Sequence, residues 1–275
     1  MTNIRKDGLK LFVYVVTISS LICELSIIFT GNSIFYFVLM WIPALAAIIS
    51  IIFEGNKYKR EINLMNYLNK LGFKTCKLKY IFISILIPFI YLLIPYIIHW
   101  IIFPEYFAYN GVSFIVIIED CLFPLVLGIF LGLASALGEE IGWRGYFVPT
   151  LNKIYGEKKS LIYSSAFWCL WHLPLIIGGA YLSTIPILYQ VPMFIMCIFP
   201  VGLICGKLAL KTQSVWPSAF LHAAHNNFDQ GVFQLITRGP YMYYLVSETG
   251  LFTAIAVWVI VIVYYILNRK KGIEI

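Results

Sequence analysis

The chain is dominated by apolar segments long enough to cross a lipid bilayer. A helix needs about 20 apolar residues to span the roughly 30 Å hydrocarbon core. The segments that meet or approach this length are residues 11–30, 33–53, 80–103, 112–148, 160–182, 185–207, 215–228 and 245–267. The sequence therefore predicts an all-α fold: a polytopic membrane helical bundle of about eight transmembrane helices, forming one integral membrane domain over residues 1–275.

Composition supports a membrane protein. Hydrophobic residues make up 61% of the chain and charged residues 12%, against about 25% charged residues in soluble domains. The excess of 20 basic over 13 acidic residues could indicate nucleic-acid binding, but the positions of the basic residues favour a membrane and no nucleic-acid partner. The six cysteines form no CxxC pair and five lie in apolar runs, so no disulfide framework is predicted.

The basic residues also predict how the chain crosses the bilayer. Lysine and arginine accumulate in short cytoplasmic loops. If the N-terminus is cytoplasmic, every lysine and arginine except Arg238 falls on the inner side. This predicts an integral protein of the cell membrane with both termini cytoplasmic. Residues 62–73 place Ile62, Met65, Leu68 and Leu71 about one turn apart beside lysines, which is typical of an amphipathic helix on the inner surface.

The fourth apolar segment contains a charged cluster, Gly138-Glu139-Glu140-Ile141-Gly142-Trp143-Arg144. We expect Glu119-Asp120 to divide this long segment into an interfacial lead-in at 112–118 and a membrane helix at about 121–146. An ionisable group near the bilayer centre costs roughly 2.5–3.5 kcal/mol, so such groups usually face a cavity or a partner and carry function.

Helical rise places the polar residues of three segments in one layer. Counted from the predicted inner loops, Glu139, Glu140, His172 and His222 all lie roughly 16–21 Å from the inner end, at about 1.5 Å per residue. We therefore expect the fourth, fifth and seventh helices to enclose an intramembrane active-site cavity.

Spacing within the helices supports this cavity, because residues three or four apart share a face. Glu140 and Arg144 are four apart and can form an ion pair. His222 is four residues before Asn226 and three before His225, so either imidazole could face inward.

These side chains favour hydrolytic chemistry. A buried carboxylate can act as general base for a water, with histidine and asparagine as metal ligand, orienting donor or oxyanion stabiliser. Cys169, one turn before His172, is the one candidate nucleophile.

The ordered motifs resemble a known family. Glu139-Glu140-x-x-x-Arg144, then Trp168-x-x-x-His172 followed by Leu173-Pro174, then His222-x-x-x-Asn226 are similar to the motifs of the CPBP intramembrane proteases. That family includes type II CAAX prenyl endopeptidases and bacterial bacteriocin-processing or self-immunity (Abi) proteins. The resemblance covers a catalytic core at about 122–228. The family usually has phenylalanine where this chain has Trp168, so we expect a differently shaped pocket wall.

The resemblance implies roles for the motif residues. Glu139 would activate water with the help of His172, and His222 with Asn226 would stabilise the oxyanion. Glu140 and Arg144 would orient and neutralise the site. Family members are commonly called metalloproteases, and Glu139, His172 and His222 would suit a catalytic zinc, although no HExxH helix is present. The implied enzyme is an intramembrane endopeptidase, with a membrane-associated, amphipathic or prenylated peptide as substrate.

Other interpretations stay open at this point. A buried ion-pair network could fix helix packing, a silent bacteriocin immunity or scaffold protein could bind through the same cavity, and a transporter would show inverted repeats or broken helices. Some further polar residues are interpreted as structural: these are Glu24, His99, Glu119, Asp120, His225 and Asp229, the last as a cap or hydrated group at a helix end.

Overall fold

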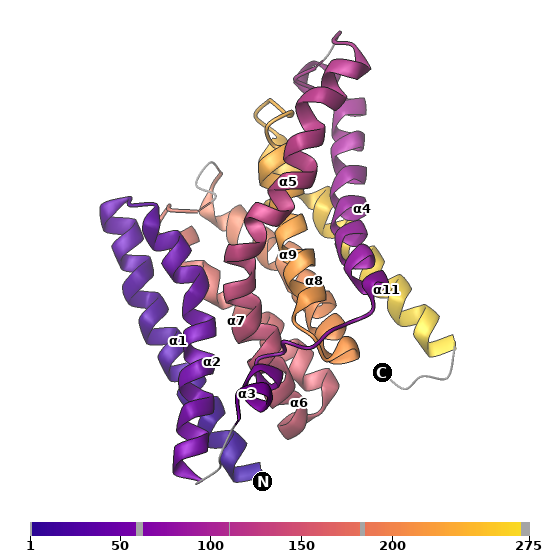
Figure 1. Ribbon diagram of the computed structural model, residues 1–275. Coiled ribbons are helices and arrows are strands. Elements are labelled where there is room, and N and C mark those ends of the chain that lie inside the picture. The colour runs from indigo at the N-terminus through magenta and orange to yellow at the C-terminus, as the bar shows by residue number, and fades with distance from the viewer. Residues whose placement is uncertain (1, 59–62, 110, 182–184, 271–275) are drawn as a thin grey trace.

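The computed structural model describes residues 2–58, 63–109, 111–181 and 185–270, and nearly all of these residues are helical. The elements are α1 (Thr2–Thr30), α2 (Ile34–Lys57), α3 (Leu64–Lys70), α4 (Leu78–Ile102), η1 (Pro104–Tyr106), α5 (Phe114–Glu140), η2 (Ile141–Phe147), α6 (Val148–Tyr155), α7 (Glu157–Ile177), α8 (Ile187–Thr212), α9 (Trp216–Phe228), η3 (Asp229–Phe233), α10 (Met242–Leu245), η4 (Ser247–Thr249) and α11 (Leu251–Lys270). The all-α membrane bundle predicted from the sequence is confirmed (Figure 1).

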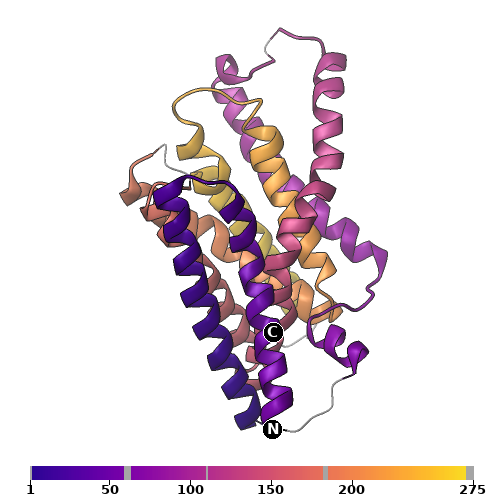
Figure 2. The same cartoon turned by 60° about the vertical axis from the view of Figure 1, so that its left-hand side comes forward.

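The helices form an elongated bundle with α9 near its centre. The antiparallel pair α1 and α2 lies side by side on one flank, and α4 and α11 lie on the other (Figures 1 and 2). α9 contacts α4, α5 and α8. Nine of its 13 residues are buried, among them the small side chains of Ser218, Ala219, Ala223 and Ala224, so neighbouring helices can approach it closely. The third motif is therefore held in the middle of the bundle.

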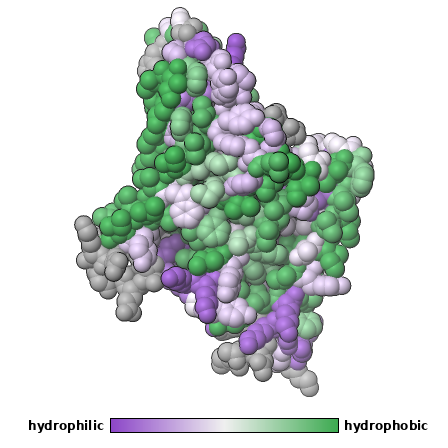
Figure 3. Space-filling model, turned by 180° about the vertical axis from the view of Figure 1, so that it is seen from behind, coloured by the Kyte–Doolittle hydropathy of each residue, from purple (hydrophilic) through white to green (hydrophobic). Residues whose placement is uncertain are grey.

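Six helices are long and apolar enough to cross a membrane: α1, α2, α4, the continuous stretch Ile115–Tyr155, α7 and α8. The two remaining predicted spans also lie on helices. α9 has 13 residues and is too short to cross the bilayer alone, because it rises only about 20 Å. The described apolar part of α11, Leu251–Leu267, is likewise shorter than a full span. Hydrophobic side chains cover most of the back of the molecule, as Figure 3 shows.

The predicted break at Glu119-Asp120 is wrong. α5 runs without interruption from Phe114 to Glu140, so residues 115–118 belong to the same helix rather than to a separate lead-in. Glu119 and Asp120 are both exposed, and Asp120 accepts a hydrogen bond from the Tyr109 hydroxyl at 2.8 Å. Charges at this exposed end of α5 need no break in the helix.

The basic connections gather at one end of the bundle, the lower end of Figure 1. The turn between α8 and α9 contacts the segment after α3 through Val215 N–H and the Gly72 carbonyl, 2.9 Å apart, and Lys207 of α8 pairs with Glu157 of α7. Arg238 contacts Tyr106 at the other end. Which end faces the cytoplasm stays a prediction. α3 covers part of the surface helix predicted at residues 62–73. Some residues used in the sequence predictions lie outside the described ranges: Lys59, Arg60, Ile62, Leu182 and Lys271.

Two glycines of the charged cluster bring its helix against α2. A Cβ added to Gly138 would lie 2.7 Å from the Met40 carbonyl oxygen, and one added to Gly142 would lie 2.4 Å from the Pro43 backbone. Small residues four apart allow membrane helices to approach closely. The α-helix gives way to the π-helical η2 at this contact, and all seven residues of η2 are buried. The close packing on α2 fixes the position of the acidic pair.

The close approach predicts that Gly142→Ala destabilises the protein. The added methyl group would overlap the Pro43 backbone, and overpacking of this kind costs about 1–3 kcal/mol. Gly132→Ala in α5 is the matched control, because its nearest neighbouring atom would lie 3.9 Å away and alanine is the better helix former. Denaturant unfolding in mild detergent measures both variants. An equal free energy of unfolding for the two variants would contradict the close contact between Gly142 and Pro43.

Candidate active site

The second glutamate of the cluster, Glu140, is the centre of a buried ion-pair network. Its Oε1 accepts from Arg144 Nη1 at 2.7 Å and lies 3.1 Å from His222 Nδ1. Both the Glu140 and Arg144 side chains have no exposed surface. A carboxylate only accepts hydrogen bonds, so His222 carries a proton on Nδ1. The network joins the first and third motifs, which are 82 residues apart.

The first glutamate, Glu139, is linked to the second motif through Trp168. The Trp168 indole Nε1–H donates to Glu139 Oε2 at 2.9 Å. The backbone carbonyl of the same residue lies 2.7 Å from His172 Nδ1, and because a carbonyl only accepts, His172 carries its proton on Nδ1. In neutral His172, Nε2 is then an unprotonated acceptor. Trp168 therefore orients both groups of the predicted water-activating pair.

Trp168 also lies against the positive charge of the network. The Arg144 guanidinium carbon is 4.1 Å from the centre of the Trp168 ring, a cation–π contact. The ring meets His172 and His222 edge to face, with centroids 5.4 and 5.5 Å away. Phe167 packs instead on Trp143 and Phe147 and does not line the cavity.

The motifs meet at a cavity of about 200 Å³. One water takes about 30 Å³ of liquid volume, so the cavity has room for a water and part of a peptide. Its acidic, imidazole and amide lining comes from α5, α7, α9, η3 and η4, and consists of Glu139, His172, His222, His225, Asn226, Gln230 and Glu248. Tyrosine and tryptophan side chains complete the polar lining, among them Tyr36 of α2 and Tyr181 of the segment after α7. The predicted cavity between the fourth, fifth and seventh helices is thus present, with a further contribution from the segment before α11.

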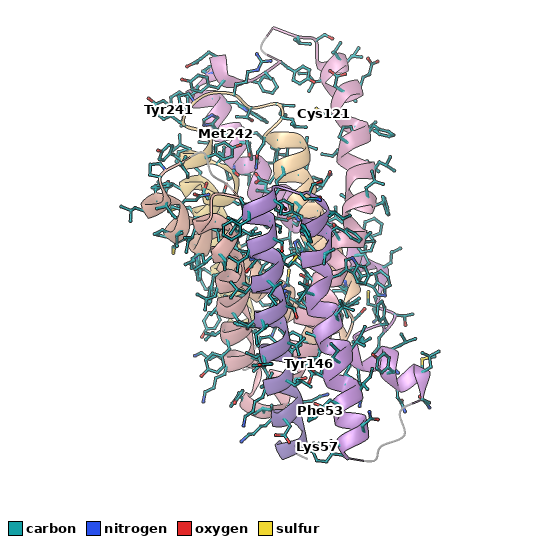
Figure 4. The ribbon with its side chains drawn as sticks, turned by 90° about the vertical axis from the view of Figure 1, so that its left-hand side faces the viewer. Phe53, Lys57, Cys121, Tyr146, Tyr241 and Met242 are labelled. Carbon is teal, nitrogen blue, oxygen red and sulfur yellow. The ribbon has the colours of Figure 1, made fainter. Side chains whose placement is uncertain are left out.

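The predicted residues divide into two groups at this cavity. Glu139, His172, His222 and Asn226 line it, whereas Glu140 and Arg144 lie behind its wall. Asn226 is half-buried, and its amide has no hydrogen-bond partner among the described residues, so it can donate into the cavity. Figure 4 places Cys121 and Tyr146 toward opposite ends of the molecule, so the acidic pair, six and seven residues before Tyr146, lies between these ends.

Cys169 does not lie at the cavity. Its side chain is buried, 2% exposed, and it is not among the lining residues. This arrangement favours a water rather than a thiol as the attacking group.

The donors predicted to bind zinc are not grouped as a preformed metal centre in this arrangement. Within the described ranges, no group of three or more histidine, cysteine, aspartate or glutamate side chains has the geometry to hold a metal ion. His222 Nδ1 faces Glu140, and Glu139 accepts from Trp168. Zinc at Glu139, His172 and His222 stays a prediction, and we derive no step through it.

Sequence reasoning missed Glu248, Gln230 and Tyr181. Tyr181 and Gln230 both donate hydrogen bonds to Glu248, the latter at 3.0 Å. A signal was present for Glu248, because it lies in the first turn of the segment 245–267 that was predicted to span the membrane, where an acid is costly. Its partners are distant in sequence and follow no regular spacing.

The remaining polar residues behave in different ways. Glu24 and His99 are buried in the bundle, as expected for structural groups. Asp229 is the C-cap residue of α9, as one of its two interpretations had it, but it is fully buried and accepts from Tyr96 and Gln234, each at 2.8 Å, so the alternative of a hydrated group is wrong. His225 lines the cavity.

The fold and site together define a membrane-embedded helical bundle with carboxylate and imidazole groups around an internal cavity. Residues 121–228 match the family described as type II CAAX prenyl endopeptidase Rce1-like. A stretch of 89 residues is 38% identical to CAAX prenyl protease 2 of Methanococcus maripaludis, covering 31% of this chain and 32% of that protein. The matched stretch spans about a third of that curated relative. These matches confirm the predicted CPBP relationship: the chain carries an Rce1-like segment that contains all three motifs.

The buried ion pair predicts strongly non-additive stability effects. Arg144→Met leaves the Glu140 carboxylate buried without its guanidinium partner, and breaking a buried pair from one side costs about 3–5 kcal/mol. The double variant with Glu140→Gln removes both charges and is expected to regain much of this loss. Unfolding in mild detergent, arranged as a double-mutant cycle, measures the coupling. Two losses that simply add would contradict a direct Glu140–Arg144 interaction.

Proposed function

We propose that this chain is an intramembrane endopeptidase that hydrolyses a peptide bond in a membrane-associated, amphipathic or lipidated peptide. The observation that carries the proposal is the convergence of Glu139, His172, His222 and Asn226 on one cavity inside the bundle. The Rce1-like match supports a protease generally. A buried site favours substrates that partition into the bilayer.

Hydrolysis begins with a water held by two acceptors. Glu139 and His172 both line the cavity, and Trp168 fixes both, which leaves the unprotonated Nε2 of His172 as the second acceptor. A water that donates to these groups presents an oxygen lone pair to a substrate carbonyl. Glu139 takes the water proton as the oxygen attacks, which is general base catalysis, and returns it to the leaving amine as the C–N bond breaks.

The oxyanion of the tetrahedral intermediate is stabilised from α9. The Asn226 amide can donate to it directly. His222 can donate from Nε2 when the ring is doubly protonated, because Nδ1–H already faces Glu140. The buried Glu140 carboxylate stabilises that imidazolium, and Arg144 balances the negative charge of Glu140. Fixed donors aimed at the developing charge commonly supply the largest part of such catalysis.

We expect Glu139→Gln to abolish most turnover. The amide cannot take a proton from water, and general base catalysis contributes about 10²–10⁴-fold. The assay measures cleavage of quenched-fluorescence peptides, with and without a farnesylated cysteine, by purified protein in lipid nanodiscs. Glu24→Gln makes the same chemical change at a buried glutamate outside the cavity and should retain activity. Glu139→Gln activity equal to that of wild type, or an inert wild type that still protects cells from a toxic peptide, would overturn the proposal.

Trp168→Phe should lower kcat about 10- to 100-fold with little change in KM. Phenylalanine keeps an aromatic wall but lacks the N–H that donates to Glu139, and a hydrogen bond to a charged group is worth about 1.5–3 kcal/mol. Trp258→Phe is the matched control, since that indole donates to the Met196 backbone carbonyl, remote from the motifs. Steady-state kinetics with one cleaved peptide separates the two parameters. An unchanged kcat for Trp168→Phe would remove Trp168 from the mechanism.

A further inference from the structure

The cavity has a second polar region beyond the motif residues. Gln230 lies in η3, just beyond the C-terminal end of α9, the helix that carries His222. Gln230, Tyr181 and Glu248 line this far part of the cavity and hydrogen-bond to one another. The mechanism above uses none of these groups, and Glu248 lies outside the matched residues 121–228.

Glu248 differs from Glu140 in having no described lysine or arginine partner beside it. Its described partners are the Tyr181 hydroxyl, the Gln230 amide and the His225 imidazole. No lysine or arginine is among the residues that line the cavity. Glu140, by contrast, is paired with Arg144.

The His225 ring lies between Glu248 and Tyr91. Its Nε2 is 3.2 Å from Glu248 Oε1, and its Nδ1 is 2.8 Å from the Tyr91 hydroxyl. The Nε2 contact is a close approach rather than an aligned hydrogen bond, because Nε2 has no hydrogen-bond partner in the described part of the chain. The guanidinium that pairs with Glu140 therefore has no counterpart at Glu248.

The backbone that carries Glu248 is held in an unusual conformation. Ser247 has φ +71°, in the left-handed region that non-glycine residues seldom occupy. The Ser247 hydroxyl donates to Asp229 at 3.0 Å, and the Thr249 hydroxyl donates to the Tyr243 carbonyl at 2.7 Å. Contacts on both sides thus fix the turn that places Glu248 at the cavity, and strain of this kind often accompanies function.

We propose that Glu248 makes the enzyme select substrates with a positively charged side chain within about four residues of the hydrolysed bond. This inference rests on the proposed endopeptidase function. His225, three residues after His222, lies 3.2 Å from Glu248, so the two polar regions adjoin, and an extended peptide that advances about 3.3 Å per residue reaches from one to the other within a few residues. A lysine or arginine of the substrate supplies the permanent cation that Glu248 lacks, whereas an acidic side chain or a free carboxylate there is repelled.

The test compares matched peptides in nanodiscs. A cleaved quenched-fluorescence peptide is prepared with Lys, Gln or Glu at each of the four positions on either side of the bond. Wild type is expected to cleave the Lys form at least about tenfold faster than the Glu form at one or two positions, as expected for a nearby charge in a site of low dielectric. Glu248→Gln should reduce this ratio to about two or less while still cleaving the Gln form. Glu24→Gln, the matched control, should keep the wild-type ratio.

The possible outcomes separate this inference from the proposed function. Cleavage that depends on Glu139 but shows no charge preference, or a preference that Glu248→Gln leaves intact, overturns the role of Glu248 alone. If Glu248→Gln lowers the cleavage rate of the Lys, Gln and Glu forms equally, Glu248 has a structural role, and the proposed selection by charge is overturned as well. Absence of any cleavage that depends on Glu139 overturns the endopeptidase function itself.

Discussion

The buried pair of Glu140 and Arg144 is the interaction on which the rest of the site depends. Both side chains are inaccessible to solvent, where a single unpaired charge would be very costly. The pair is held at the contact between η2 and α2, where Gly138 and Gly142 bring the two backbones together. From there it reaches His222 through a second hydrogen bond. Because Arg144 neutralises Glu140 behind the cavity wall, Glu139 can face the cavity. The Glu139-Glu140-x-x-x-Arg144 spacing serves these two roles.

The two regions of the cavity differ in how their charges are balanced. Around the motif residues, the Glu140 carboxylate has a guanidinium partner, and Trp168 connects the remaining groups through its indole N–H and its carbonyl. Around Glu248, the described partners are a tyrosine hydroxyl, a glutamine amide and the His225 imidazole, and no lysine or arginine lines the cavity. In the proposed enzyme the first region performs hydrolysis and the second senses the charge of the substrate.

The sequence predicted the features that follow a regular spacing along the chain, and those that would cost free energy if placed unpaired in the bilayer. Apolar runs of about 20 residues located the helices, and counting residues along them put Glu139, His172 and His222 in one layer. Features that depend on distant contacts were missed: Glu248 reaches the cavity from a turn with a positive φ at Ser247. Trp168 was expected to change only the shape of the wall, because hydrogen bonding by an indole depends on which way the ring faces. The break expected at Glu119 and Asp120 failed because these charges lie at the exposed end of α5, where they cost little.

In the proposed enzyme, a water activated by Glu139 attacks the peptide bond, and no covalent enzyme intermediate forms. Rapid-quench mass spectrometry of the intact protein during turnover of a cleaved peptide in nanodiscs tests this step. We expect product to accumulate while the protein keeps its unmodified mass at every time point. A transient mass increase equal to the acyl fragment of the peptide, located by digestion at Cys169 or at Glu139, would show that a side chain rather than water makes the first attack.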